Sequence, residues 1–131
     1  MSQENVEPVR KVLAAFNQRD LGSFLMLMDD EVEANSRLAP MEGGYHGHDG
    51  IRRWWENLLD AFPDRTIEVV EVRNFGEATL AVVRNRGHGG GSDTPFEEPL
   101  WLVAWWRRGK CIRWDACQTQ AEALEAAGLS E

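Results

Sequence analysis

The second half of this chain has the pattern of consecutive β-strands joined by short turns. Apolar and β-branched residues are dense in four ranges, 66–74, 78–86, 96–107 and 110–118. Glycine and charged residues mark the turns at 74–77 and 107–110, and a longer glycine-rich loop covers 87–94. Strands that follow one another through such short connections pair antiparallel. The pattern therefore predicts a largely antiparallel sheet.

The first half has the spacing of amphipathic helices. Apolar residues recur every three or four positions between Val6 and Phe16, and Asn5 is placed to cap this helix. A second, shorter helix is predicted to begin at Asp20. A short strand is then predicted at 31–36. Two helices therefore precede the first strand.

A third helix is predicted after a glycine-rich loop at 41–47. Its apolar residues run from Ile51 to Phe62, and His48 or Asp49 can cap it. Helices followed by antiparallel strands give an α+β layout, in which a curved sheet wraps against the helices. Helices over the concave face leave a cone, and the open end of a cone is a natural pocket for a small molecule.

Composition limits the class of protein to which the chain can belong. A length of 131 residues suits a single domain over 1–131, and 43% hydrophobic with 27% charged residues is ordinary for a globular protein. The net charge of −8 argues against nucleic acid as a partner, because phosphate contacts need clustered Lys and Arg. The polar N-terminus and the absence of a long apolar run predict a cytoplasmic protein without a membrane partner.

The two cysteines, Cys111 and Cys117, lie six residues apart on one predicted strand. We expect their side chains on the same face of the strand but too far apart to bridge. Both are therefore predicted to be thiols, as in a reducing compartment. No Cys-x-x-Cys motif supports a structural zinc site.

Four segments together are similar to SnoaL-like domains of the nuclear transport factor 2-like superfamily. They are Ala-Phe-Asn-Gln-Arg-Asp-Leu at 15–21, Tyr-His-Gly-His-Asp-Gly-Ile-Arg-Arg-Trp-Trp at 45–55, Ala-Phe-Pro-Asp at 61–64, and the last strand with the helical tail at 120–129. The resemblance implies a cone-shaped barrel in which a curved, mostly antiparallel sheet packs on three to four helices. Ketosteroid isomerases, limonene-epoxide hydrolases, polyketide cyclases and many non-catalytic domains share this fold, so the resemblance does not name a reaction.

Asp115 is the candidate catalytic residue that the resemblance indicates. Polyketide cyclases of this family often carry His-Trp-Asp on the last strand, with Asp as general acid or base, and this chain has Arg113-Trp114-Asp115 there. If the face of the strand with Arg113 is concave, Asp115 lies in the pocket beside a cation that favours its ionised form. The alternative is a structural ion pair of Asp115 with Arg113 or Arg84.

Tyr45 and His46 are the other candidates for chemistry. Histidine titrates near neutrality, so His46 could act as an acid or base in the pocket, and either residue could steady a developing oxyanion. His48 completes a His-x-His pattern, which is weak evidence for a metal site without a third ligand, and no metal is predicted. Helix capping is the preferred role for His48.

Aromatic and basic residues supply the candidate ligand contacts. The predicted ligand-binding residues are Phe16, Trp54, Arg84, His88, Trp101 and Trp105. Arg84 and His88 alternate along one strand face toward the glycine-rich loop, where they either line the mouth of the cone or form an exposed polar face. Six tryptophans is a high number for this length, and tryptophan on the outer sheet face suits a homodimer contact, which the resemblance also implies.

Three hypotheses for function follow. The first is an enzyme of the cyclase, isomerase or hydrolase kind that needs no cofactor, in which Asp115 moves a proton on a hydrophobic substrate and Arg113 sets its charge. The second is a module that binds a small apolar molecule without changing it; its mark is a pocket lined by Trp, Leu, Met and Phe, with Asp115 held in an ion pair away from the opening. The third is an interaction domain whose own side chains fill the cone.

Overall fold

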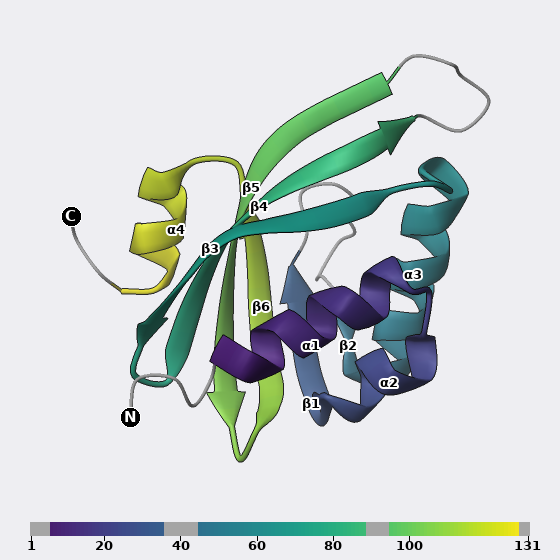
Figure 1. The fold of residues 1–131 in the computed structure, drawn as a ribbon. Helices are drawn as coiled ribbons and strands as arrows, with labels where there is room; N and C mark the ends of the chain where they lie inside the picture. Colours follow the sequence, from purple (N-terminus) through teal and green to yellow (C-terminus); the bar gives the residue numbers. More distant parts are fainter. Residues whose placement is uncertain (1–5, 36–44, 89–94, 129–131) are drawn as a thin grey trace.

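A six-stranded sheet forms the frame of the protein, seen in a computed structural model that describes residues 6–35, 45–88 and 95–128 (Figure 1). The strands are β1 (Met28–Asn35), β2 (Tyr45–His46), β3 (Thr66–Phe75), β4 (Ala78–His88), β5 (Pro95–Arg107) and β6 (Lys110–Cys117). Their spatial order is β2-β1-β6-β5-β4-β3, and every neighbouring pair is antiparallel except β1 with β6. The predicted α+β class with a mostly antiparallel sheet is confirmed. The sheet is open, with β2 and β3 at its two edges, rather than a closed barrel.

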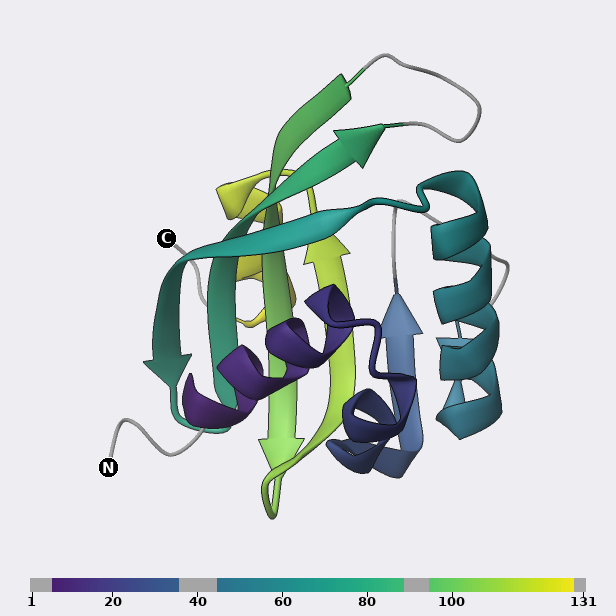
Figure 2. The same ribbon diagram turned by 45° about the vertical axis from the view of Figure 1, so that its right-hand side comes forward.

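The described residues form four helices, which cover both faces of this sheet. They are α1 (Val6–Asn17), α2 (Leu21–Met26), α3 (Gly47–Ala61) and α4 (Gln120–Ala126). Figure 2 shows α1, α2 and α3 in front of the sheet and α4 behind it. Among these helices, none has the length and apolar character needed to cross a membrane.

The observed N-terminal end of one helix is close to the predicted one, whereas the predicted caps of another helix are not found. The Asp20 carboxylate accepts from the backbone N–H of Ser23 at 3.1 Å and so caps α2, which begins one residue after the predicted start at Asp20. At α3 the predicted caps were wrong, because His48 and Asp49 lie inside the first turn and His46 is the N-cap, without a side-chain cap hydrogen bond. The predicted cap of α1, Asn5, lies outside the described residues.

Long-range pairing explains the other differences in element bounds. Tyr45 and His46, predicted to be loop, form a two-residue strand because they pair with Ala34 and Glu33 of β1. β1 begins at Met28, earlier than predicted, because Met28 pairs with Cys111 of β6. Such parallel pairing between segments distant in the chain leaves no local signal in the sequence.

A β-bulge in β6 overturns the expectation that both cysteines share a face. Trp105 pairs with Arg113 whereas the next residue, Trp106, pairs with Cys111, so Ile112 is an extra residue in β6. Cys111 therefore joins the core under α1 to α3, and Cys117 joins the smaller core under α4. No disulfide joins the two, as predicted.

Candidate functional site

A cavity of about 80 Å³ lies between the first three helices and the sheet. This volume is several times the roughly 10–15 Å³ that one water needs. The helices contribute Val9, Val12, Leu13, Phe16, Phe24, Trp54 and Leu58 to its lining, and the sheet with the turn before it contributes Met28, Arg65, Ile67, Thr79, Ala81, Leu100, Leu102, Ala104, Trp106, Cys111, Trp114 and Ala116. The lining is almost entirely apolar.

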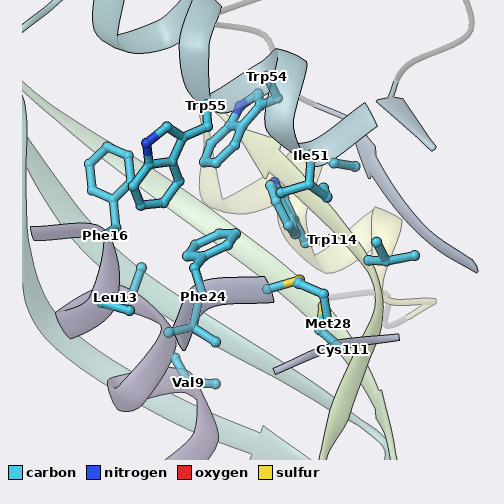
Figure 3. Close-up of a cluster of buried hydrophobic side chains, with 14 of the residues drawn as sticks. Val9, Leu13, Phe16, Phe24, Met28, Ile51, Trp54, Trp55, Cys111 and Trp114 are labelled. Carbon is cyan, nitrogen blue, oxygen red and sulfur yellow. The ribbon is translucent and has the colours of Figure 1, made fainter. Parts of the chain in front are cut away.

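Aromatic side chains from four elements form one wall of the cavity. Figure 3 shows Phe16 of α1, Phe24 of α2, Trp54 of α3 and Trp114 of β6 turned toward one another. The ring centroids of Trp54 and Trp114 lie 5.0 Å apart at an angle of 71°, and those of Phe24 and Trp54 lie 5.7 Å apart. The first pair packs edge to face and the second is stacked, and such packing favours one orientation of each ring. The wall is therefore a fixed surface.

Arg65 is the charged residue among those that line the cavity, and its backbone is held in place from two sides. The Arg19 guanidinium donates to the carbonyl oxygen of Arg65 at 2.6 Å and to that of Pro63 at 3.0 Å. On the other side, Gly87 of β4 allows the chain to pass closely, because a Cβ there would lie 3.1 Å from the Cα of Arg65 and 2.9 Å from the Asp64 carboxylate. These contacts fix the backbone at Arg65, whose buried side chain contributes to the cavity lining.

The guanidinium of Arg65 is buried, and it donates no hydrogen bond to the described residues. The residue is 2% exposed, and its Nε and Nη1 have no partner there. Its nearest aromatic contact is the Phe62 ring, with the guanidinium carbon 5.9 Å from the ring centroid. Burial lowers the pKa of Arg65 to about 10, and the charge of Glu98 acts in the opposite direction. Arg65 therefore stays protonated at neutral pH.

Other polar groups lie near the cavity. Asn85 is fully buried, and both polar atoms of its amide have no partner among the residues described. Thr79 accepts a hydrogen bond from Nε1 of Trp106 at 3.0 Å and is thereby satisfied. Burial raises the pKa of Cys111 to about 12, so this cysteine is a neutral thiol at neutral pH.

Asp115 and Arg113 lie on the face of β6 opposite to the cavity. Trp114 and Ala116, the alternate residues, line the cavity, so the condition that would have placed Asp115 in the pocket is not met. The guanidinium of Arg113 donates to the Asp115 carboxylate at 3.1 and 3.3 Å and lies 5.0 Å from the Trp105 ring centroid. The side chain of Asp115 is 14% exposed. The structure thus brings together the pair that sequence predicted, away from the cavity.

Tyr45 and His46 are adjacent in β2 but point to different surroundings. Tyr45 is buried, and its hydroxyl accepts from the Asn57 amide at 3.4 Å. His46 is exposed and lies 3.1 Å from the Glu31 carboxylate. His48 contacts the carbonyl oxygen of Met28 at 3.0 Å. None of the three lines the cavity, and the described residues contain no cluster of three His, Cys, Asp or Glu side chains that could hold a metal.

The six predicted ligand contacts divide into two groups. Phe16 and Trp54 line the cavity. Trp101 and Trp105 are half-buried against α4, and Arg84 is exposed and 3.4 Å from the Glu97 carboxylate. His88 is exposed at the end of β4, where its Nδ1 lies 2.7 Å from the Asp64 carboxylate. Self-association through the outer sheet face stays a prediction.

Neither Arg65 nor Asn85 was predicted from the sequence to be a buried polar residue of the site. A signal for Arg65 was present, because Arg65, Ile67 and Val69 alternate along one strand and the last two are apolar. Extending this alternation back by two residues places Arg65 on the face that meets the helices. Asn85 alternates in the same way with Val83 and Ala81 in β4.

Comparisons with known proteins identify the fold. The family model of the SnoaL-like domain matches residues 9–114. A search of curated proteins found none that matches the chain. An NTF2-like protein of unknown function from Burkholderia pseudomallei superposes with a TM-score of 0.81 at 20% identity, covering 95% of this chain and 97% of that chain.

Two further solved structures have the same fold. TerC, co-crystallised with polyporic acid, has a TM-score of 0.79 at 18% identity, with 93% of this chain and 96% of that chain covered. IdmH from Streptomyces antibioticus, a putative polyketide cyclase, has a TM-score of 0.76 at 18% identity, with 95% and 99% covered. At these identities the likeness establishes the fold alone.

Proposed function

This chain belongs to the SnoaL-like domain family, and we propose that it binds a small apolar molecule in the cavity between its first three helices and the sheet. The observation that carries the proposal is the apolar lining of Phe, Trp, Leu and Val side chains with few polar groups. Pockets of this composition bury most of a ligand's surface and use their polar groups to orient it.

The place of Asp115 supports binding over chemistry. A carboxylate that is paired with Arg113 and lies across the sheet from the cavity is the arrangement expected for a binding module. The volume of about 80 Å³ also favours a binding module over a domain whose own side chains fill the cone. The occupant is accordingly a small molecule with a hydrocarbon body.

The test fills the cavity and measures ligand binding. Toluene, cyclohexanone and indole serve as neutral apolar probes, and stabilisation against unfolding reports binding by mass action, about 2.7 kcal/mol at a probe concentration of 100 times Kd. Ala104→Leu puts a larger side chain into the cavity lining, whereas Ala14→Leu makes the same change on an exposed position of α1. Circular dichroism checks that both variants fold.

We expect at least one probe to stabilise the wild type and Ala14→Leu but to lose most of its effect on Ala104→Leu. If no probe stabilises the wild type, the binding proposal fails. If a probe stabilises both variants equally, it binds elsewhere on the protein.

Acid–base catalysis by Asp115 is the second candidate. The match of Trp114-Asp115 to the cyclase pattern and the similarity of fold to IdmH favour it. Its substrate would approach the side of the sheet that α4 covers. Asp115→Asn should then abolish turnover of hydrophobic ketones or hydroxylated aromatics while circular dichroism stays unchanged, with Asp49→Asn on the exposed surface of α3 as the control. Unchanged turnover in Asp115→Asn removes this candidate.

A further inference from the structure

We propose that the molecule bound in the cavity carries a carboxylate, and that the buried guanidinium of Arg65 binds it. This inference rests on the proposed function, because it names the chemical class of the ligand for the same cavity. The ligand is then a small apolar body with one anionic end.

The unpaired polar groups of the residues that line the cavity are buried donors. Nε and Nη1 of Arg65 and Nε1 of Trp54 have no hydrogen-bond partner within the part of the chain that the structure describes. Guanidinium and indole nitrogens donate and do not accept. Buried donors without acceptors are unfavourable, so a ligand that supplies oxygen acceptors gains affinity here. A carboxylate has two such oxygens.

The charge around Arg65 favours an anion over a neutral acceptor. Arg19 and Glu98 are the charged residues that act on the Arg65 guanidinium, one positive and one negative, so together with Arg65 the group is net positive. Glu98 shares a face of β5 with Leu100 and is half-buried, and among the described residues no carboxylate lies within the ion-pair distance of 4.0 Å from Arg65. A buried cation without a paired anion is costly, and an anionic ligand offsets this cost.

The backbone position of Arg65 is set before the ligand binds. Arg19 fixes its carbonyl oxygen, Gly87 admits its backbone, and the Asn17 amide makes two hydrogen bonds to the backbone of Ile67, at 2.8 and 2.9 Å. A rigid planar guanidinium suits the two oxygens of a carboxylate. Less conformational freedom is therefore lost when the ligand binds.

Matched probe pairs test the charge of the ligand. Benzoate is compared with benzyl alcohol, and cyclohexanecarboxylate with cyclohexylmethanol, by calorimetry at pH 7.5, where both acids are ionised. We expect each carboxylate to bind the wild type about 10- to 100-fold more tightly than its alcohol, the range of a charge-assisted hydrogen bond. Arg65→Met should remove this preference and leave alcohol binding within a few-fold of the wild type.

Two further variants separate the role of Arg65 from general effects. Arg65→Lys keeps the charge and loses the planar fork, so it should retain part of the preference. Arg53→Met removes an exposed arginine of α3 and should retain all of it. Thermal unfolding of every variant checks that the fold is intact.

The outcomes distinguish this inference from the proposed function. If alcohols and carboxylates bind equally and Arg65→Met changes neither, the carboxylate proposal is overturned while the binding cavity stands. If none of the four probes binds, both proposals fall. If Arg53→Met removes the preference as fully as Arg65→Met does, the carboxylate binds at the surface and the proposal is also overturned.

Glu98 offers an independent measurement in the opposite direction. Because its negative charge acts on Arg65, Glu98→Gln should tighten benzoate binding several-fold and leave benzyl alcohol unchanged. Glu97→Gln is the matched control, since Glu97 is exposed and paired with Arg84 and Arg86. Weaker benzoate binding in Glu98→Gln contradicts the proposed charge balance.

Discussion

The two faces of the sheet use alternate residues of the same strands, yet they differ in how their charged groups are satisfied. On β6, Trp114 points into the cavity and Asp115 points away from it. On β5, Ala104 lines the cavity, and Trp105 packs toward α4 under the guanidinium of Arg113. The sheet face under α1 to α3 therefore borders the cavity, whereas the other face is covered by the short helix α4 and carries the ion pair of Arg113 with Asp115.

Two arginines, one on each face, differ in whether they have partners. Arg113 is half-exposed and has both a carboxylate and an aromatic ring as partners. Arg65 is buried, and the described residues give its Nε and Nη1 no acceptor. A paired surface arginine has little effect on stability, whereas an unpaired buried one lowers stability and indicates a function. Of the two faces, the cavity face therefore has the features of a binding site.

The largest expected effect contrasts tryptophans on the two faces. Trp114→Ala should lower the free energy of unfolding by about 3–5 kcal/mol, because it removes a buried ring that packs on Trp54 and Phe24. Trp105→Ala should lower it by about 1–2 kcal/mol, since Trp105 is only half-buried and loses its contact with Arg113 and its packing on the small core under α4. Urea unfolding measures both. Equal losses would contradict the ranking of the two faces.

Sequence periodicity predicted most of the fold because each long element buries one face. The helix at 6–17 and the four strands of the second half were recognisable from apolar spacing alone. The two-residue strand at Tyr45 and the early start of β1 depend on pairing with distant segments. These were not predictable from local patterns.

The candidate site was harder to predict, because it depends on which face of its strand each side chain occupies. One bulge at Ile112 changed the faces of Cys111 and Cys117 relative to each other. Trp54 and Phe16 were predicted as ligand contacts and do line the cavity. Arg65 was missed because an arginine just after a helix stop resembles an exposed turn residue. Its burial follows from Arg19 and Gly87, which are distant in the chain.

A smaller effect, opposite in sign, is expected at Arg65. Arg65→Met removes a buried charge, and replacing buried ionic groups by apolar ones is neutral or stabilising, on the order of 1–4 kcal/mol. We therefore expect the protein without ligand to unfold at the same or higher urea concentration than the wild type. Arg53→Met, on the exposed surface of α3, should change stability by less than about 0.5 kcal/mol.

A large loss of stability in Arg65→Met would mean that the guanidinium is a structural group. The proposed difference between the two faces, in which Arg65 serves binding rather than stability, would then be wrong. Adding benzoate to the wild type should reverse the order of stability, because ligand binding stabilises only the protein that binds it.

The smallest effect concerns Asp64, which neighbours Arg65 but points outward. The hydrogen bonds from the His88 side chain and backbone N–H lower the pKa of Asp64 below its ordinary value of 3.8. A lowered pKa in the folded protein stabilises the fold above the unfolded value, and this contribution is lost as pH falls through the folded value. Wild type should therefore exceed Asp64→Asn in stability from neutral pH down to about pH 4, and the difference should vanish at lower pH.

Urea unfolding of both proteins between neutral and strongly acidic pH measures this difference, with Asp60→Asn on the exposed surface of α3 as the control. A difference that stays constant down to the lowest pH would show that Asp64 acts through its shape rather than its charge. Asp64 and the backbone of Arg65 both lie against Gly87, so the affinity of Asp64→Asn for benzoate shows whether the pair of Asp64 with His88 also supports Arg65. Benzoate affinity should then weaken in Asp64→Asn by a few-fold at most, since Arg19 still holds the carbonyl oxygen of Arg65.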